Sequence, residues 1–390
     1  MTGGVIVVGG GIAGVSTAAA LRSGGFDGDL TLIDAGELPY DRPPLSKEFL
    51  SGAKEIKDIA LQPEGWYDDQ SVRLVSRTTV TALRPGDGAV ELSDGTFVRA
   101  DRVVLATGGR AVRPPIPGCG NSRVHVLRTA EDADRLRAAL VPGATVLVVG
   151  AGLIGAEVAS TARTLGCEVT LADPVCPPLF QVFGEDVAAW LHGVHAEHGI
   201  KTVHSGVDSL DEQDADVVVL GVGMVPETTL AEAAELETDR GIIVDHGQVT
   251  SNPAVLAVGD PARLRHATRT GHWEAAQHDG QRAAATILGN PAPAATAPWF
   301  WTHRHALHVE VVGDLGAATT TVVRGSLGEP PFAAFGLHGG RVVGAVAVND
   351  PTAVRAARRM IDRAIAADPA RLADPATDLR RLLRGEGTPP

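Results

Sequence analysis

Short runs of apolar, β-branched residues alternate along the chain with stretches of good helix formers. The run Val5–Val8 is followed by glycines and then by the helical stretch Ala18–Leu21. The run Val146–Val149 repeats this order, with glycines and a helical stretch that extends to Arg163. Short apolar runs bounded by glycine and followed by helical sequence are typical of parallel strands in βαβ units. The pattern therefore predicts an α/β fold with two Rossmann-like domains.

Three further apolar runs are predicted to be short buried strands: Val103–Ala106, Val217–Leu220 and Val255–Val258. The pattern changes after the Pro/Ala-rich segment Ala292–Pro298, which we interpret as a linker. Beyond it lie four β-rich segments and one helix: Val309–Val312, Thr319–Val323, Phe332–Leu337, Val342–Val348 and Ala353–Ala366. The chain is thus predicted to close with a smaller α+β domain. We expect its tail, Gly385–Pro390, to be disordered.

The composition excludes several classes of protein. The 390 residues carry 34 Lys and Arg against 47 Asp and Glu, a net charge of −13, and so acidic a chain is a poor nucleic-acid binder. The three cysteines, Cys119, Cys167 and Cys176, include no CxxC pair, which excludes a vicinal redox dithiol, a zinc ribbon and a four-cysteine iron–sulfur cluster. We expect a cytoplasmic protein, because no disulfide framework, signal peptide or membrane-spanning apolar run is evident.

The glycine-rich segment Gly9–Gly14 fits the pattern GxGxxG. With 46 glycines in the chain this pattern occurs by chance about 0.6 times, so alone it has little weight. Its context is specific, because it follows a predicted strand, opens a predicted helix and is followed by Asp34, 20 residues after Gly14 (34 − 14). Such a loop binds a pyrophosphate at the helix N-terminus, and the acid binds ribose hydroxyls. The expected dinucleotide-binding residues are Gly9, Gly11, Ile12, Ala13, Gly14 and Asp34.

The segment Gly150–Gly155 repeats the arrangement, with Asp173 as the ribose acid 18 residues after Gly155 (173 − 155). An acid here accepts a ribose 2′-hydroxyl and repels a 2′-phosphate. No arginine follows in Pro174–Pro178, so the sequence favours NADH over NADPH. Two dinucleotide sites indicate one cofactor held and one exchanged, as in a flavoprotein that takes hydride from a nicotinamide. The expected residues are Gly150, Gly152, Leu153, Ile154, Gly155 and Asp173.

Further motifs stand in a fixed order along nearly the whole chain: Tyr40–Lys47, Leu105–Gly108, Pro114–Gly118, Gly221–Pro226, Ala257–Asp260, His272–Ala276 and Phe300–Trp301. The string DRPPLSK, which ends at Lys47, is the most specific, because a general disulfide reductase has a cysteine motif there. In these motifs the chain resembles the FAD-dependent ferredoxin reductases of Rieske oxygenase and cytochrome P450 systems, the putidaredoxin-reductase-like branch.

The resemblance implies that the first Rossmann unit holds FAD and that the second, inserted unit binds NADH. From this resemblance we expect an FAD domain in residues 1–112 and 236–298, an NADH domain in residues 113–235 and a C-terminal α+β domain in residues 299–390.

The resemblance also assigns roles to single residues. It implies that Arg42 and Lys47 approach the flavin, that Asp260 binds the ribityl or phosphate side, and that Trp301 lies near the isoalloxazine. Glu157 corresponds to an acid that points toward the nicotinamide and pairs with Lys47. The other implied cofactor-binding residues are Thr107, Gly108, Arg110, Gly223, Gly259 and Trp273.

Lys47 has support of its own, because only four lysines occur in this arginine-biased chain. A compact ammonium close to a flavin would stabilise negative charge on the reduced ring. Without the surrounding motif an exposed loop lysine would be the favoured interpretation. With the motif, we expect Lys47 and Glu157 to be the catalytic pair.

The chain departs from the family pattern at three places. The segment Val207–Val219 is too short for the usual β-hairpin, and the family's arginines are absent after Asp173. Trp301 is followed by His303-Arg304-His305, where the family has an acidic or amide residue. Because an electron partner would dock at this last place, the change after Trp301 leaves the partner's identity open.

Two groups of histidines need interpretation. The first, His192, His195 and His198, cannot all face one ion, because residues i and i+6 of a helix point about 240° apart. We interpret it as a solvated helix face. The second, His303, His305 and His308, is interpreted together with Arg304 as a basic, partly protonated strip. We expect no metal site.

These observations predict an NADH:ferredoxin oxidoreductase in which NADH delivers hydride to FAD and electrons pass singly to an iron–sulfur ferredoxin, of the 2Fe–2S kind, that feeds an oxygenase. Arg42 and Arg304 are candidates for a basic face that docks an acidic ferredoxin. Two alternatives stay open. One is an NADH oxidase or diaphorase that resembles the apoptosis-inducing-factor branch. The other is a non-catalytic flavin-binding redox sensor, suggested by the shortened segment near Asp211. The oligomeric state is also open.

Overall fold

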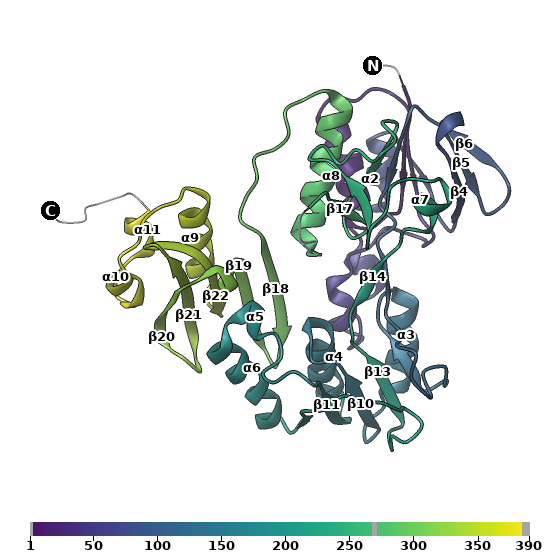
Figure 1. The fold of residues 1–390 in the computed structure, drawn as a ribbon. Helices are drawn as coiled ribbons and strands as arrows, with labels where there is room; N and C mark the ends of the chain where they lie inside the picture. The colour runs from purple at the N-terminus through teal and green to yellow at the C-terminus, as the bar shows by residue number, and fades with distance from the viewer. Residues whose placement is uncertain (1–2, 267–270, 384–390) are drawn as a thin grey trace. The chain divides into compact units, whose positions relative to one another are not determined.

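The computed structural model describes residues 3–266 and 271–383. The chain divides into two compact units. The first consists of Met1–Leu45, Ala53–Ala111 and Met224–Ala294, and the second of Ser46–Gly52, Val112–Gly223 and Ala295–Pro390. Each unit contains a five-stranded parallel sheet (Figure 1), which confirms the predicted α/β fold with two Rossmann-like regions.

The first unit is built on a parallel sheet with the strand order β16-β7-β1-β2-β3. Its strands are β1 (Val5–Val8), β2 (Leu30–Ile33), β3 (Val72–Val75), β7 (Arg102–Leu105) and β16 (Val255–Ala257). β1 and β2 are buried along their whole length, as expected for parallel strands covered on both faces.

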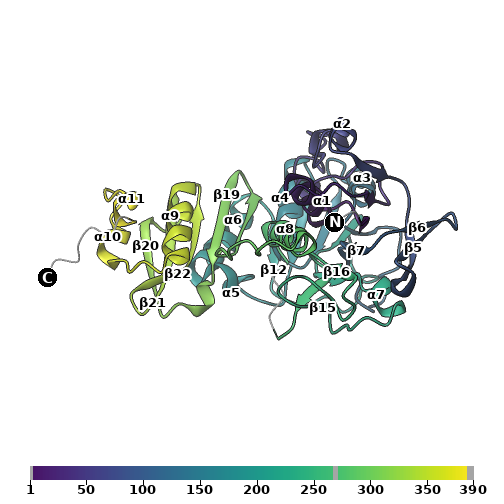
Figure 2. The same ribbon diagram turned by 90° about the horizontal axis from the view of Figure 1, so that it is seen from above.

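Two different layers cover this sheet. One face packs against α1 (Ile12–Ser23) and α8 (Trp273–Leu288), which lie side by side (Figure 2). They approach closely because residue 280 is glycine: a Cβ there would lie 2.5 Å from the carbonyl oxygen of Ala13. The other face packs against an antiparallel sheet of β4 (Val80–Arg84), β5 (Ala89–Leu92) and β6 (Phe97–Arg99). The unit also contains α2 (Glu64–Asp69), β8 (Gly109–Ala111), β14 (Met224–Pro226), α7 (Thr229–Ala233), β15 (Ile242–Val244) and β17 (Ala262–Leu264).

The second unit begins with a parallel sheet of order β12-β11-β10-β13-β9. Its strands are β9 (Val124–Val126), β10 (Thr145–Val149), β11 (Glu168–Ala172), β12 (Lys201–Val203) and β13 (Val217–Leu220). Its helices are α3 (Ala130–Ala139), α4 (Leu153–Thr164), α5 (Phe180–Phe183) and α6 (Glu185–Glu197). The shortened segment before β13 forms no strand, and the guanidinium of Arg123 holds it by donating to the carbonyls of Leu210, Gln213 and Ala215.

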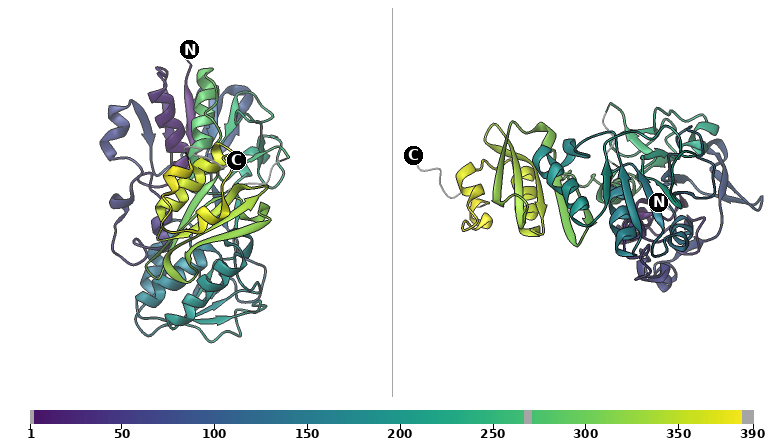
Figure 3. Two further views of the ribbon diagram at one scale, coloured as in Figure 1. Left: turned by 90° about the vertical axis from the view of Figure 1, so that its left-hand side faces the viewer. Right: turned by 90° about the horizontal axis from the view of Figure 1, so that it is seen from below.

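The same unit contains the predicted C-terminal β-rich region, an antiparallel sheet of order β18-β19-β22-β21-β20. Its strands are β18 (Trp299–Arg304), β19 (Leu307–Gly313), β20 (Thr320–Ser326), β21 (Glu329–His338) and β22 (Arg341–Val348). One face packs on α9 (Pro351–Asp362), α10 (Pro369–Ala373) and α11 (Leu379–Leu382), and the other on α5 and α6 (Figures 1 and 3).

The predicted strand Val217–Leu220 is confirmed with the same bounds, and the predicted C-terminal helix ends earlier, at Asp362. The helix stops because Ala364 adopts φ +51°, in the left-handed region. The predicted disordered tail, Gly385–Pro390, lies outside the described residues. Among those that are described, no helix combines the length and the apolar composition that a membrane crossing requires.

Candidate functional site

The first glycine loop joins β1 to α1 by a turn that only glycine can make. Gly9 has φ +110°, and a Cβ on Gly14 would lie 1.9 Å from the carbonyl oxygen of Gly9. At Gly11, by contrast, a Cβ would meet no atom within 4 Å. Because α1 begins at Ile12 without a side-chain cap or an acidic residue in its first turn, its first N–H groups suit the pyrophosphate of a dinucleotide.

Asp34 follows β2 and is hydrogen-bonded to this loop. Its Oδ2 accepts from the backbone N–H of Gly10 at 2.5 Å, and its Oδ1 accepts from that of Gly36 at 2.8 Å. A carboxylate has about four acceptor positions, so two remain for ribose hydroxyls. The geometry therefore brings Asp34 together with the glycine loop, as predicted, although its role in binding stays a prediction.

The second glycine loop has the same geometry in the second unit. Gly150 has φ +98°, and a Cβ on Gly155 would lie 1.9 Å from the carbonyl oxygen of Gly150. Gly152 precedes α4 without a side-chain cap, and Leu153 opens the helix. Ile154 is 45 % exposed in the first turn, so it is accessible to a ligand at this helix end.

Asp173 repeats the contacts of Asp34. Its Oδ2 accepts from the N–H of Ala151 at 2.7 Å and its Oδ1 from the N–H of Val175 at 2.8 Å. The chain thus contains two loops of matching geometry, each with an aspartate held by the loop backbone. Both fit a dinucleotide.

A second segment of the first unit reaches the start of α1. Gly259 has φ +72°, and a Cβ there would lie 2.8 Å from the Cβ of Ala13, so Gly259 and Asp260 lie beside the first turn of α1. Asp279, which the sequence analysis missed, accepts from the N–H of Gly259 at 3.2 Å and from Gln248 Nε2 at 3.2 Å. Its burial raises the pKa of this carboxyl to about 6.

The remaining predicted residues of the first unit belong to two hydrogen-bonded groups. Thr107 Oγ1 donates to the carbonyl oxygen of Glu227 at 2.7 Å, and Arg110 Nε lies 2.6 Å from Glu227 Oε2. Gly108 lies between them with φ +73°. In the other group Trp273 Nε1 donates to Asp41 Oδ1 at 2.6 Å.

Arg42 is half-buried in this unit, one residue after Asp41. Glu227 and Asp41 were not predicted as site residues. Asp41 carried a signal, because it opens the DRPPLSK motif. Gly223, with φ +106°, belongs to the second unit, whereas Gly259 belongs to the first.

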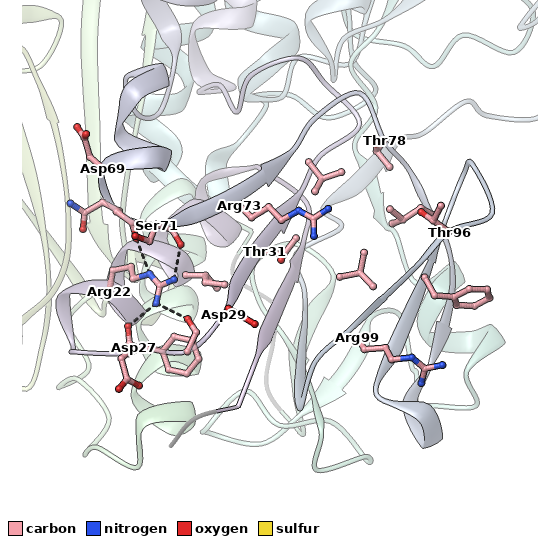
Figure 4. Close-up of a pocket in the computed structure, with 18 of the residues that line it drawn as sticks. Arg22, Asp27, Asp29, Thr31, Asp69, Ser71, Arg73, Thr78, Thr96 and Arg99 are labelled. Atoms are coloured by element: carbon pink, nitrogen blue, oxygen red, sulfur yellow. Dashed lines mark hydrogen bonds between the residues drawn. The ribbon is translucent and has the colours of Figure 1, made fainter.

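A hollow of about 1050 Å³ also lies in the first unit, lined by the beginning of β2, by β3 and by the β5–β6 hairpin (Figure 4). Arg22, at its edge, is fully engaged, because it donates to the carbonyls of Phe26, Gly28, Gln70 and Ser71. The hollow includes Leu30 and Thr31, at the amino end of β2, whereas Asp34 follows its carboxyl end. Ligands of open α/β sheets bind at the carboxyl ends of strands, so the glycine loop is the better cofactor site.

Glu157 forms the centre of a polar cluster in the second unit. It lies on α4, two residues after Gly155, and is only 3 % exposed. Lys47 Nζ donates to its Oε2 at 2.9 Å, which agrees with the predicted pairing. Ser46 Oγ also donates to Oε2, at 2.5 Å, and Thr302 Oγ1 donates to Oε1 at 2.7 Å.

The backbone N–H of His303 completes this cluster by donating to Glu157 Oε1 at 3.2 Å. Four donors therefore fill the acceptor positions of one buried carboxylate, which fixes its orientation. Trp301 precedes Thr302 on β18, and because side chains alternate along a strand its ring lies on the other face of β18, stacked on that of Trp299 at 4.9 Å between centroids. The sequence analysis identified Lys47 and Glu157 but missed Ser46 and Thr302.

Three predictions about the two histidine groups were wrong. Arg304 is not part of a docking face, because it is only 5 % exposed. His195 is buried rather than on a solvated helix face. His303 and His305 do not make the strip basic, because burial, with neighbouring charges, lowers the pKa of His303 and lowers that of His305 to about 4.

These side chains are buried because the β18–β19 hairpin places His305 against α6. There the Nε2 atom of His305 lies 2.9 Å from the Nδ1 atom of His195. Among the residues that the structure describes, no group of three His, Cys, Asp or Glu side chains has an arrangement that could hold a metal ion.

Comparisons with known proteins agree with this geometry. Residues 3–280 match the family model "Pyridine nucleotide-disulphide oxidoreductase", and residues 299–383 match "Reductase C-terminal". The chain is 39 % identical to the anthranilate 1,2-dioxygenase system ferredoxin–NAD(+) reductase component of Burkholderia cepacia, over 97 % of this chain and 98 % of that protein. It is 33 % identical to putidaredoxin reductase of Pseudomonas putida, over 97 % and 96 %.

A solved structure, that of the covalent putidaredoxin reductase–putidaredoxin complex, matches with a TM-score of 0.91 and 32 % identity over 99 % of both chains. The matches thus cover both glycine loops, the Lys47–Glu157 cluster and the C-terminal sheet. The chain belongs to the pyridine nucleotide-disulphide oxidoreductase family and, within it, to the ferredoxin–NAD(+) reductases of oxygenase systems.

Proposed function

We propose that this protein is an FAD-dependent reductase that passes electrons from NADH to an iron–sulfur ferredoxin, of the 2Fe–2S kind, which serves an oxygenase. The observation that carries the proposal is the duplicated site: each unit has a glycine loop, an uncapped helix and an aspartate held by the loop. The free cysteines, one buried, one half-buried and one exposed, fit transfer without a redox disulfide. They also fit a cytoplasmic location.

The two loops are assigned to the two cofactors as follows. FAD is held in the first unit, by the Gly9–Gly14 loop and Asp34, with Gly259 and Asp260 beside the start of α1. NADH binds and is exchanged in the second unit, where the Gly150–Gly155 loop and Asp173 hold it. Bound FAD supplies the redox chemistry, since it accepts a hydride and releases electrons one at a time.

Lys47 and Glu157 are the proposed catalytic pair. Ser46, Thr302 and the backbone of His303 orient the carboxylate of Glu157, which in turn holds the ammonium of Lys47 at 2.9 Å. A cation held in this way is preorganised to stabilise negative charge that develops on a bound ring system. We propose that Trp301, one residue before Thr302 on β18, lies near the isoalloxazine.

Ferredoxins of such systems are commonly acidic, so the docking face should be locally basic although the chain carries −13. With Arg304 buried, Arg42 is the predicted candidate that remains, and α9 supplies further ones. Arg355 and Arg359 are exposed at i and i+4 of this helix, and Arg363 is exposed just after it. This stripe is the proposed site for the acidic partner.

The proposed function is tested by NADH consumption with and without a [2Fe–2S] ferredoxin. We expect turnover to need the ferredoxin and to fall as the salt concentration rises from about 0.01 M to 0.5 M, since opposite charges on the two proteins are then screened. Rapid oxygen uptake without ferredoxin would instead indicate an oxidase. Turnover that is flat with salt would contradict an electrostatic docking face.

Replacement of Asp173 by alanine tests the assignment of NADH to the second unit. The variant is expected to raise the KM for NADH by about 10-fold or more, because a charged hydrogen-bond acceptor for the ribose is lost. It should also narrow the preference for NADH over NADPH, because the repulsion of a 2′-phosphate is lost as well. Steady-state kinetics with both nucleotides measure the two effects, with the exposed Asp208→Ala as the control. An unaltered preference would remove Asp173 from the ribose site.

A further inference from the structure

Arg304, the last residue of β18, places an unpaired cation in the interior of the second unit. Its Nε and Nη2 atoms are buried and have no hydrogen-bond acceptor among the described residues. These two atoms form one edge of the guanidinium, and that edge binds two oxygens of an oxyanion side by side. The guanidinium carbon lies 5.7 Å from the ring centroid of Phe183, so an aromatic ring and not an acid covers it.

Two histidines beside Arg304 also have buried nitrogens without partners. They are His192 and His195, each with an unpaired Nε2. In the described part of the chain, the one other buried side-chain nitrogen or oxygen without a partner is the hydroxyl of Tyr67. Unpartnered buried donors are therefore concentrated in Arg304, His192 and His195. When His195 Nδ1 accepts from His305 Nε2, 2.9 Å away, the hydrogen of His195 is on its Nε2, which is then a free donor.

The buried charge of Arg304 favours an anion over water alone. Burial, followed by the charge of Arg304, lowers the pKa of His195 to about 2, so this imidazole is neutral. Glu157 is the acid whose charge acts on Arg304, but Ser46, Lys47, Thr302 and the N–H of His303 already occupy its acceptor positions. Lys47, Glu157 and Arg304 together carry one net positive charge. Asp173 is a further acid near this group, but its charge acts on His192 and its carboxylate accepts from the N–H groups of Ala151 and Val175. The guanidinium of Arg304 therefore lacks an acceptor of its own among the residues that the structure describes, and burial of such a charge is unfavourable.

We propose that Arg304, His195 and His192 bind one compact monovalent oxyanion, either a short carboxylate or bicarbonate. Two of its oxygens would accept from the Nε and Nη2 edge of Arg304, and imidazole N–H groups would donate to it from α6. A monoanion matches the charge of the one guanidinium whose buried donors lack acceptors among the described residues, and a planar oxyanion matches its two-atom edge. This site is independent of the proposed electron transfer, because it rests on the unpaired donors alone.

The test measures the thermal unfolding midpoint of the FAD-loaded protein at fixed pH and ionic strength. Sodium acetate or sodium bicarbonate replaces sodium gluconate, whose polyol chain is much bulkier than either test anion. We expect a saturable rise of about 3–6 °C in acetate, in bicarbonate or in both, and the stronger of the two arms identifies the class of ligand. Equal midpoints in all three salts would show that only water fills the cluster and would overturn the proposal.

Variants of Arg304 show whether the rise in the unfolding midpoint depends on this residue. Arg304→Gln is expected to abolish the rise, whereas Arg341→Gln, the same change at an exposed position of the same unit, is expected to keep it. Arg304→Lys keeps the charge but loses the two-atom edge, so the half-saturating anion concentration should increase at least about 10-fold. A rise that persists unchanged in both Arg304 variants would place the anion elsewhere and overturn the proposal. Broadening of the resonance of ¹³C-acetate by the native protein, lost in Arg304→Gln, gives a readout that does not depend on unfolding.

Discussion

Replacement of Lys47 by alanine is expected to slow the reduction of the flavin by NADH about 10- to 100-fold while FAD stays bound. The reason is local to the second unit. The ammonium of Lys47 is held 2.9 Å from Glu157, a carboxylate that is 3 % exposed, so its removal deletes a preorganised cation. It also leaves Glu157 with only neutral donors, which adds an unpaired negative charge to the proposed nicotinamide site.

Anaerobic rapid mixing with NADH, followed in the visible absorbance of the flavin, measures this rate. Lys201→Ala is the matched control, because Lys201 is an exposed lysine of the same unit. Glu157→Gln separates the two causes, since it removes the negative charge and leaves Lys47 in place. If Lys47→Ala were reduced as fast as the native protein, Lys47 would not belong to the catalytic pair.

Acidification is expected to destabilise the second unit steeply between about pH 6.5 and pH 4. Burial, followed by the charge of Arg304, lowers the pKa of His195 to about 2, and burial, followed by His198, lowers that of His305 to about 4. The folded-state pKa of both groups is below the unfolded value of about 6.5. The unfolded chain therefore binds protons that the folded chain does not, so stability is present above pH 6.5 and is lost as the pH falls.

The buried His195 alone corresponds to a loss of about 1.4 kcal/mol of unfolding free energy per pH unit in this window. His305 adds a smaller share, because its ring is partly exposed and solvent screens its charge. Urea unfolding at pH 7, 6, 5 and 4.5 measures the slope. His195→Gln should have a slope shallower by about one proton, whereas the exposed His246→Gln should keep the native slope. Equal slopes in the native protein and His195→Gln would mean that His195 is not held neutral.

The sequence predicted those parts of the site that depend on short spacings. Gly9, Gly14 and Asp34 could be identified because a strand, a tight turn and a helix follow one another within 30 residues, and the turn tolerates no side chain at Gly14. The same holds for Gly150, Gly155 and Asp173. Spacing of this kind is a property of a single βαβ unit, and backbone sterics enforce it.

The partners of Glu157 could not be predicted in the same way. Ser46, Glu157 and Thr302 are 111 and 145 residues apart, and they meet only because the chain returns to α4 with β18. Lys47 was identified because the DRPPLSK motif resembles a family, not because its spacing to Glu157 has a physical signal. Tertiary pairing of this kind leaves no periodicity in the sequence.

The burial of Arg304 and His195 shows a second limit. A histidine-rich stretch with an arginine is typical of a solvated surface, and the pattern predicted one. The backbone N–H of His305 donates to Ser160 Oγ at 2.8 Å, so the β18–β19 hairpin is anchored on α4 and its polar side chains are carried inward. The decisive information is the position of the hairpin, which local sequence does not specify.

Electrons from NADH are proposed to leave through the flavin, singly, to a ferredoxin. The most direct measurement is an anaerobic count of electrons with the protein in which Cys119, Cys167 and Cys176 are all replaced by serine. We expect one equivalent of NADH to bleach the flavin absorbance and then to reduce two equivalents of [2Fe–2S] ferredoxin, as in the native protein. A flavin that NADH does not bleach, or a ferredoxin that stays oxidised after the flavin is bleached, would contradict the claim.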